Sequence, residues 1–322
     1  MLFQKVFNRC LDEITCWLLL LYQRFVGKPL LISAEKYGRI GNRLYLASHL
    51  VAWSRKVGAE LLNLGVHDYE DLFEGTYQDG LCRYPEPAMP LPMSKGFKAL
   101  AFQSVERIAI RLLRQSSRRF QSIDLLPEAP RIGAPDFKLS LVAKPVTFIR
   151  GFIYDNSLPD IAEEHPAIKR YFRPRKNYLP DITQPIQELR KVSDVVLGIV
   201  IRHGDFKTWR GGEFYFETAD YVRLMDRAVE YLAPRKVSFF IASDEIQPPE
   251  DFQQHLHFFR AGHPIENLGA LALCDGMLAA HSSFTGWSQY YGTVPTFHIA
   301  RDLDHSQLYQ VLDSAVAKAK AA

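Results

Sequence analysis

Three short polar segments in the C-terminal part of the sequence each follow directly on an apolar run that predicts a buried strand. Ligands of open α/β proteins bind beyond the carboxyl ends of the strands, so these segments are expected to meet around one ligand. The segments are Arg202-His203-Gly204-Asp205, Ser243-Asp244-Glu245 and His281-Ser282-Ser283.

The residue types in these segments are suited to binding an anion. Arg202 offers parallel N–H donors that match a phosphate. Ser282 and Ser283 stand at the start of a predicted helix, where free backbone N–H groups and the helix dipole attract phosphate. Each residue also has a plainer interpretation, because Arg202 can pair with Asp205 and a serine can simply cap the helix. Their combination favours a phosphorylated ligand.

A fourth candidate lies near the N-terminus, in the loop Gly38-Arg39-Ile40-Gly41-Asn42-Arg43. The pattern predicts a strand over 30–33 before this loop, a helix over 44–57 after it, with Gly58 as the C-cap, and a second strand over 60–64. Glycine has no Cβ, so the backbone of this loop could approach a ligand closely. This is a Rossmann-like β–loop–α–β opening.

Strands and helices alternate regularly after residue 193. Helices are expected over 218–232, 267–274 and 283–291, with Asn267 as the N-cap of the second. Such alternation predicts a parallel sheet covered by helices on both faces. We therefore expect two Rossmann-like domains, 1–190 with a Pro-rich insert over 83–93, and 191–322.

Composition limits the class of protein and of ligand. The 322 residues are 47% hydrophobic and 23% charged, which excludes a disordered chain and a coiled-coil rod. A net charge of +3 gives no reason to expect nucleic acid as a partner. The four cysteines form no C-x-x-C pair and the histidines show no metal-ligand spacing, so no metal site is expected. Free thiols fit a reducing compartment, which indicates a cytoplasmic protein.

The N-terminal segment contains an apolar run over 16–22, which is too short to span a bilayer. Acidic residues precede it, unlike the basic start of a signal peptide. It predicts either an amphipathic helix packed on the protein or an interfacial helix that contacts a membrane through residues 14–26. A predicted helix over 98–114 carries Arg107, Arg111 and Arg114 on one side, which would form a solvated basic face or meet an anionic partner.

Several of these segments resemble the motifs of GDP-fucose-dependent fucosyltransferases, especially the α-1,2 type. Residues 198–206 (GIVIRHGDF) resemble the motif HVRRGDY, and residues 267–287 (NLGALALCDGMLAAHSSFTGW) resemble DLxLMxxCDxNIxxNSSFSWW without a gap. Residues 38–43 (GRIGNR) are similar to the family's GLGNQ loop, and Ser243-Asp244 to its SDD segment.

The resemblance implies a GT-B fold, in which two Rossmann-like domains with parallel sheets face a cleft. It implies an inverting, metal-independent transfer of fucose from GDP-fucose to a hydroxyl of a glycan or lipid-linked glycan in polysaccharide biosynthesis, without a cofactor. Domain 1–190 would hold the acceptor and domain 191–322 the donor. Arg202 would contact the donor diphosphate and Asp205 would hold Arg202 or its loop. The further donor-binding residues would be Gly38, Gly41, Asn42, Arg43, Ser243, Asp244, Asn267, Ser282 and Ser283.

The sequence also departs from the family motifs. Val200 replaces a histidine, His203 replaces an arginine, and Asn267 replaces the aspartate that reads guanine. An amide has only one acceptor oxygen, so the neighbouring Glu266 is a candidate for that role.

Two other functions fit parts of the sequence. Arg202-His203-Gly204 is also the RHG motif of histidine phosphatases, in which His203 would be the nucleophile and His281 a second histidine. The chain could also be a non-catalytic relative that binds a nucleotide sugar or a glycan.

Overall fold

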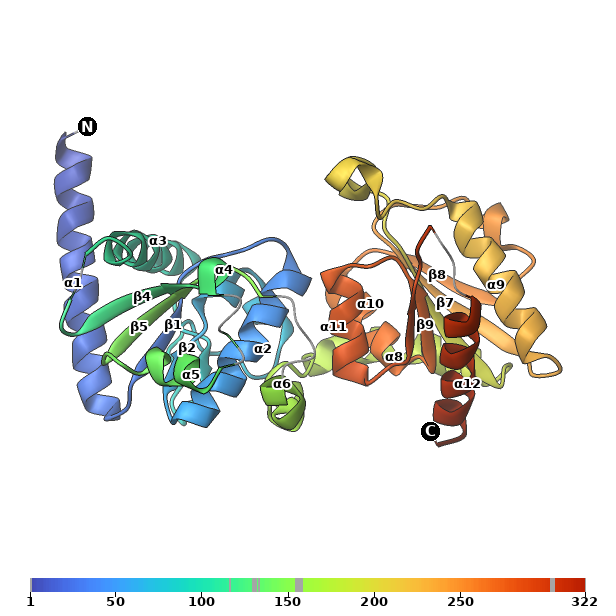
Figure 1. Ribbon diagram of the computed structural model, residues 1–322, viewed down its shortest axis with the longest axis horizontal. Helices are drawn as coiled ribbons and strands as arrows, with labels where there is room; N and C mark the ends of the chain where they lie inside the picture. Colours follow the sequence, from blue (N-terminus) through green and yellow to red (C-terminus); the bar gives the residue numbers. More distant parts are fainter. Residues whose placement is uncertain are drawn as a thin grey trace. The chain divides into compact units, whose positions relative to one another are not determined.

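The computed structural model describes residues 2–115, 117–128, 132, 134–153, 159–301 and 305–321. The chain forms two compact units, residues 1–175 and 176–322 (Figure 1). The sequence placed the division near residue 190. Residues 179–190 form helix α8 (Leu179–Arg190), which packs against helix α10 (Pro264–Leu273) and so belongs to the second unit.

The first unit is built on a five-stranded sheet with the order β3-β2-β1-β5-β4. Four strands run parallel, as predicted, but β3 pairs antiparallel with β2. The two residues of β3 are the first two of the predicted Pro-rich loop. The strands are β1 (Leu30–Ser33), β2 (Glu60–Leu62), β3 (Arg83–Tyr84), β4 (Phe120–Asp124) and β5 (Val146–Arg150).

Helices cover this sheet. Helix α1 (Leu2–Val26) packs against α3 (Lys95–Leu112), and both contribute apolar side chains to one core with Leu30 and Phe148 of the sheet. Helix α2 (Ile40–Val57) follows β1 and ends at Gly58, whose left-handed backbone (φ 65°) confirms the predicted C-cap. The remaining helices of the unit are α4 (Leu125–Glu128), α5 (Pro135–Leu141), α6 (Pro159–Glu163) and α7 (His165–Tyr171).

The second unit is built on a fully parallel sheet with the order β10-β9-β6-β7-β8. Its two central strands are buried along their whole length, which explains their continuous apolar sequences. The parallel sheet predicted for this region is therefore confirmed. The strands are β6 (Val195–Ile201), β7 (Val237–Ser243), β8 (His257–Ala261), β9 (Gly276–Ala279) and β10 (Thr296–His298).

Two cores flank the second sheet. Alternate residues of β6 pack on one face with α9 (Thr218–Leu232) and α12 (His305–Ala321), and the others pack on the opposite face with α8 and α10. The start of α10 was predicted wrongly. Helix α10 begins at Pro264 with His263 as its N-cap, because proline suits the first helical position, and Asn267 lies buried inside the helix.

Candidate functional site

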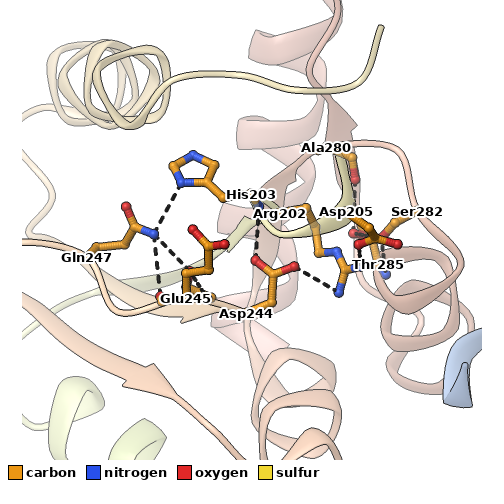
Figure 2. A network of polar contacts seen from close by, with 10 residues as sticks. Arg202, His203, Asp205, Asp244, Glu245, Gln247, Ala280, Ser282 and Thr285 are labelled. Atoms are coloured by element: carbon orange, nitrogen blue, oxygen red, sulfur yellow. Dashed lines mark hydrogen bonds and ion pairs between the residues drawn. The ribbon is translucent and has the colours of Figure 1, made fainter. Parts of the chain in front are cut away.

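The register of the second sheet brings the three predicted polar segments to one edge. Ile201 at the end of β6 pairs with Ser243 at the end of β7, and Val200 pairs with Ala279 of β9. Segment 202–205 therefore emerges between segments 243–245 and 281–283, at the carboxyl ends of parallel strands. Figure 2 shows side chains of all three segments close together.

Arg202 is held by two carboxylates. Its Nη2 lies 3.0 Å from Oδ1 of Asp205, and its Nη1 lies 3.4 Å from Oδ2 of Asp244 (Figure 2). The guanidinium also lies over the ring of Phe206, 5.0 Å from its centroid. The Nε of Arg202 is buried without a hydrogen-bond partner among the described residues. The arginine is thus fixed at the edge of the sheet, and its Nε–H group makes no hydrogen bond to the described residues.

Asp244 organises the loop that carries Arg202. Its Oδ1 accepts a hydrogen bond from the backbone N–H of His203 at 2.9 Å, while Oδ2 faces the guanidinium. A Cβ on Gly204 would come within 3.0 Å of Oδ2, so glycine lets the loop lie against this carboxylate. Both carboxylate oxygens of Asp244 thus contact the neighbouring loop that carries Arg202. The donor contact expected of Asp244 from the sequence stays a prediction.

His203 is buried and both of its ring nitrogens have partners. Nε2 lies 3.0 Å from the carbonyl oxygen of Phe216, which can only accept, so Nε2 carries the proton. Nδ1 accepts a hydrogen bond from the side-chain amide of Gln247 at 3.3 Å. That amide also donates to Ser243, which therefore takes part in loop structure. A ring held in this way is a poor nucleophile, and the geometry does not favour the histidine-phosphatase alternative.

Ser282 is the N-cap of helix α11 (Ser283–Gly292). Its hydroxyl accepts a hydrogen bond from the backbone N–H of Thr285 at 3.1 Å, and the Thr285 hydroxyl donates to the carbonyl of Ala280 (Figure 2). The plainer interpretation of Ser282 is therefore correct for its hydroxyl. Ser283 occupies the first helical position, where backbone N–H groups have no partner within the helix and attract anions.

The two candidate guanine-reading residues lie on α10. Asn267 is 3% exposed, and its Oδ1 has no hydrogen-bond partner among the described residues. Glu266 pairs with Arg260, with 3.3 Å between Oε2 and Nη1. Glu266 is the more accessible of the two, because Asn267 points into the protein. The other buried residues of the expected donor set are Gly41, Ser243 and Ser282.

In the first unit, the loop after β1 is tighter than predicted, because α2 already begins at Ile40 and includes Gly41, Asn42 and Arg43. Gly38 has a φ of 62°, and a Cβ there would meet the side-chain amide of Asn42 at 2.1 Å. Arg43 donates from Nε to the carbonyl of Gly38 at 3.2 Å. Asn42 and Arg43 line a small pocket together with Ser33, Glu35, Tyr37, Leu46, Asn63 and Gly65.

Two acidic residues beside this pocket were missed by the sequence analysis. Glu35 follows the end of β1, accepts a hydrogen bond from the backbone N–H of Gly151 at 2.8 Å, and lies 3.4 Å from Arg150. Asp68 pairs with Lys36 at 2.6 Å and with Arg43. The rule that selected Arg202 also applies to Glu35, since it follows a strand at its carboxyl end. Asp68 has no such signal.

One group of potential metal ligands, His67, Glu70 and Cys82, occurs among the described residues. All three are buried, and Glu70 already forms an ion pair with Lys98. Burial lowers the pKa of His67 to about 4, so the ring is neutral. The ammonium of Lys98 supplies a positive charge at this carboxylate without a metal.

Comparison with known proteins identifies the architecture of the fold. No protein-family model matches the sequence, and no curated protein matches it. Solved structures are similar, and two of them are a mutant of Arabidopsis thaliana FUT1 in complex with GDP and the α-1,6-fucosyltransferase NodZ soaked with GDP-fucose. The chain has the fold of the GT-B fucosyltransferases.

The similarity is one of fold rather than of sequence. FUT1 matches with a TM-score of 0.58 at 13% identity, over 86% of this chain and 71% of its own. NodZ matches with a TM-score of 0.51 at 14% identity, over 86% of this chain and 96% of its own. The predicted α/β fold with two Rossmann-like units is confirmed.

Proposed function

We propose that the protein is a glycosyltransferase that moves fucose from GDP-fucose to a hydroxyl of a glycan or lipid-linked glycan. The observation that carries the proposal is the position of Arg202, held by Asp205 and Asp244 at a strand end close to the capped N-terminus of α11. The fold supports it, because the similar FUT1 structure is a complex with GDP and the similar NodZ structure was soaked with GDP-fucose.

Arg202 would stabilise the leaving diphosphate. In an inverting transfer the acceptor oxygen attacks the anomeric carbon, the bond from that carbon to the diphosphate breaks, and GDP leaves with the electron pair. Negative charge grows on the diphosphate during this step, so a fixed guanidinium and a helix N-terminus bind the transition state better than the ground state. Asp205 is 48% exposed and can leave the guanidinium when the phosphate arrives.

The other parts of the proposal follow the two units. The second unit would hold the donor, with Ser283 and the first turn of α11 beside Arg202. Glu266 would accept from guanine in place of the buried Asn267. The first unit would hold the acceptor, and its Gly38 loop, with the Glu35 carboxylate close by, would contribute contacts to the donor. An inverting, metal-independent reaction that needs no cofactor, and an α-1,2 linkage in polysaccharide biosynthesis, stay predictions from the sequence resemblance.

A nucleotide screen followed by a transfer assay tests the proposal. A ligand that binds the folded state raises its melting temperature, so GDP is expected to stabilise the protein more than UDP, ADP or CMP. GDP-fucose with an acceptor glycan should then release GDP, and Arg202→Ala should abolish that release. Stabilisation by UDP alone would overturn fucose as the transferred sugar. Stabilisation by GDP without any transfer would instead identify a non-catalytic binding relative.

A further inference from the structure

Helix α1 exposes a continuous apolar face to solvent. This outer face consists of Phe7, Ile14, Trp17, Leu18, Leu21 and Phe25, of which Trp17 is 66% and Phe25 89% exposed. At 100° per residue these six positions span an arc of roughly 100° on one side of the helix. Along the axis, the face extends over about 27 Å from residue 7 to residue 25.

The opposite side of α1 fixes the helix to the protein. Leu19 is buried in the core shared with α3, and Cys16 packs against that core. Asp12 is buried, with its Oδ1 2.7 Å from Nη2 of Arg107 and 2.8 Å from the hydroxyl of Ser104. The outer face is therefore held away from the core by a helix that is already anchored, so its exposure is not the result of a loose terminus.

Charged residues around α1 favour an anionic partner. The helix carries Lys5, Arg9 and Arg24, and its acidic residues are Asp12 and Glu13. Asp12 is neutralised inside the protein by Arg107, and Glu13 pairs with Arg9 at 3.3 Å. Neither Lys5 nor Arg24 has an acidic partner among the described residues, so α1 carries a net positive charge beside its apolar face. This charge disfavours pairing of α1 with a second copy of itself and favours a surface of negative charge.

Arginines of α3 and the loop after it add to this charge. Arg111, Arg114, Arg118 and Arg119 are all exposed. Helix α3 packs against α1, and Arg111 lies in the last turn of α3. Burial raises the pKa of the Cys16 thiol on α1, and the charge of Arg111 opposes that rise. The sequence left open whether the basic side of this helix is only solvated. The packing of α3 against α1 brings this positive charge to the part of the first unit that carries the outer face.

We propose that the outer face of α1 docks the protein on the surface of an anionic lipid bilayer. No helix among the described residues is long and apolar enough to span a membrane, so α1 would lie in the interface plane. Trp17, Phe7 and Phe25 would enter the boundary between headgroups and acyl chains, where aromatic rings are favoured. Arg24 and the arginines after α3 would face the phosphates of the headgroups. This docking does not depend on the sugar that the protein transfers.

Vesicle co-sedimentation tests this docking with the full chain. Wild-type protein is expected to sediment with phosphatidylglycerol–phosphatidylcholine vesicles more strongly than with phosphatidylcholine alone, and less strongly at high salt. The double variant Trp17→Glu/Leu21→Glu should lose at least about tenfold in vesicle affinity, because two exposed apolar side chains become charged. Arg24→Glu should lose about fivefold, on anionic vesicles only.

Leu139→Glu is the control, since it places a glutamate, one charge for each of the two in the double variant, on an exposed apolar position of another helix of the first unit. It should bind vesicles as wild type does, and all variants should melt at the wild-type temperature. Equal vesicle binding by the double variant, or no sedimentation of wild type with anionic vesicles, would overturn the proposal. A wild-type dimer in light scattering that dissociates in the double variant, without vesicle binding, would assign the face to self-association instead.

Discussion

Arg202 and Asp205 form an ion pair in which the arginine is 14% exposed and the aspartate 48% exposed, with 3.0 Å between Nη2 and Oδ1. The two partners are therefore not equivalent. The guanidinium also contacts Asp244 and lies over the ring of Phe206, whereas Asp205 is the more exposed of the two carboxylates that contact it.

Substitution of Arg202 should remove most of the transferase activity. Arg202→Ala is expected to lower kcat/KM for GDP-fucose by about 10² to 10³, the usual effect of losing one preorganised donor in a transition state. Arg202→Lys should recover only part of this, because an ammonium cannot bind two phosphate oxygens in a fixed plane. Rates of GDP release measure the effect. Unchanged turnover in Arg202→Ala would exclude this arginine from the chemistry.

His203→Ala should affect stability and leave the chemistry intact. The substitution leaves the buried carbonyl of Phe216 without its hydrogen-bond donor and removes one acceptor of the Gln247 amide, which costs about 2 kcal/mol of unfolding free energy. Denaturant unfolding measures that loss. Turnover of the folded variant should stay within a few-fold of wild type. A phosphohistidine trapped on wild-type His203 by a phosphorylated substrate would instead support a phosphatase.

Gly38 and Gly58 offer a matched pair of substitutions. Both have a positive φ, 62° and 65°, but a Cβ on Gly38 meets Asn42 whereas a Cβ on Gly58 meets open space. Gly58→Ala is expected to cost about 1 kcal/mol, the strain of the left-handed backbone alone. Gly38→Ala should cost more, because Asn42 must also move. Equal losses in thermal unfolding would show that the contact with Asn42 is unimportant.

Burial of His298 makes stability depend on pH. Burial, together with the nearby charge of His281, lowers the pKa of His298 from 6.5 to about 4. The unfolded chain binds the proton first as the pH falls, so the neutral folded state loses stability between about pH 6.5 and 4, by up to about 3 kcal/mol. Urea unfolding at several pH values measures this. His298→Gln should flatten the curve in that window, and an identical curve would assign the loss to other groups.

The sequence determined the main elements of both units. Strand β6 and helix α9 were predicted nearly residue by residue, because a buried parallel strand and an amphipathic helix impose strong local patterns. Strand β4 was missed, since its five residues are only half-buried and show no such pattern. The N-cap assignment of Asn267 failed because Pro264 starts α10 earlier in the chain.

The residues of the candidate site were likewise predicted only in part. Sequence alone selected Arg202, Asp205 and the start of α11, because residues that follow parallel strands must reach the same edge of a sheet. Only the tertiary structure decided what holds them. Asp244 accepts a hydrogen bond from the backbone N–H of His203, and the side-chain amide of Gln247 donates one to the His203 ring. Pairing of β6 with β7 brings these residues together, although some forty residues separate them in the chain. A local sequence pattern determines whether a segment forms a strand or a helix. Sheet register and burial determine which side chains contact one another.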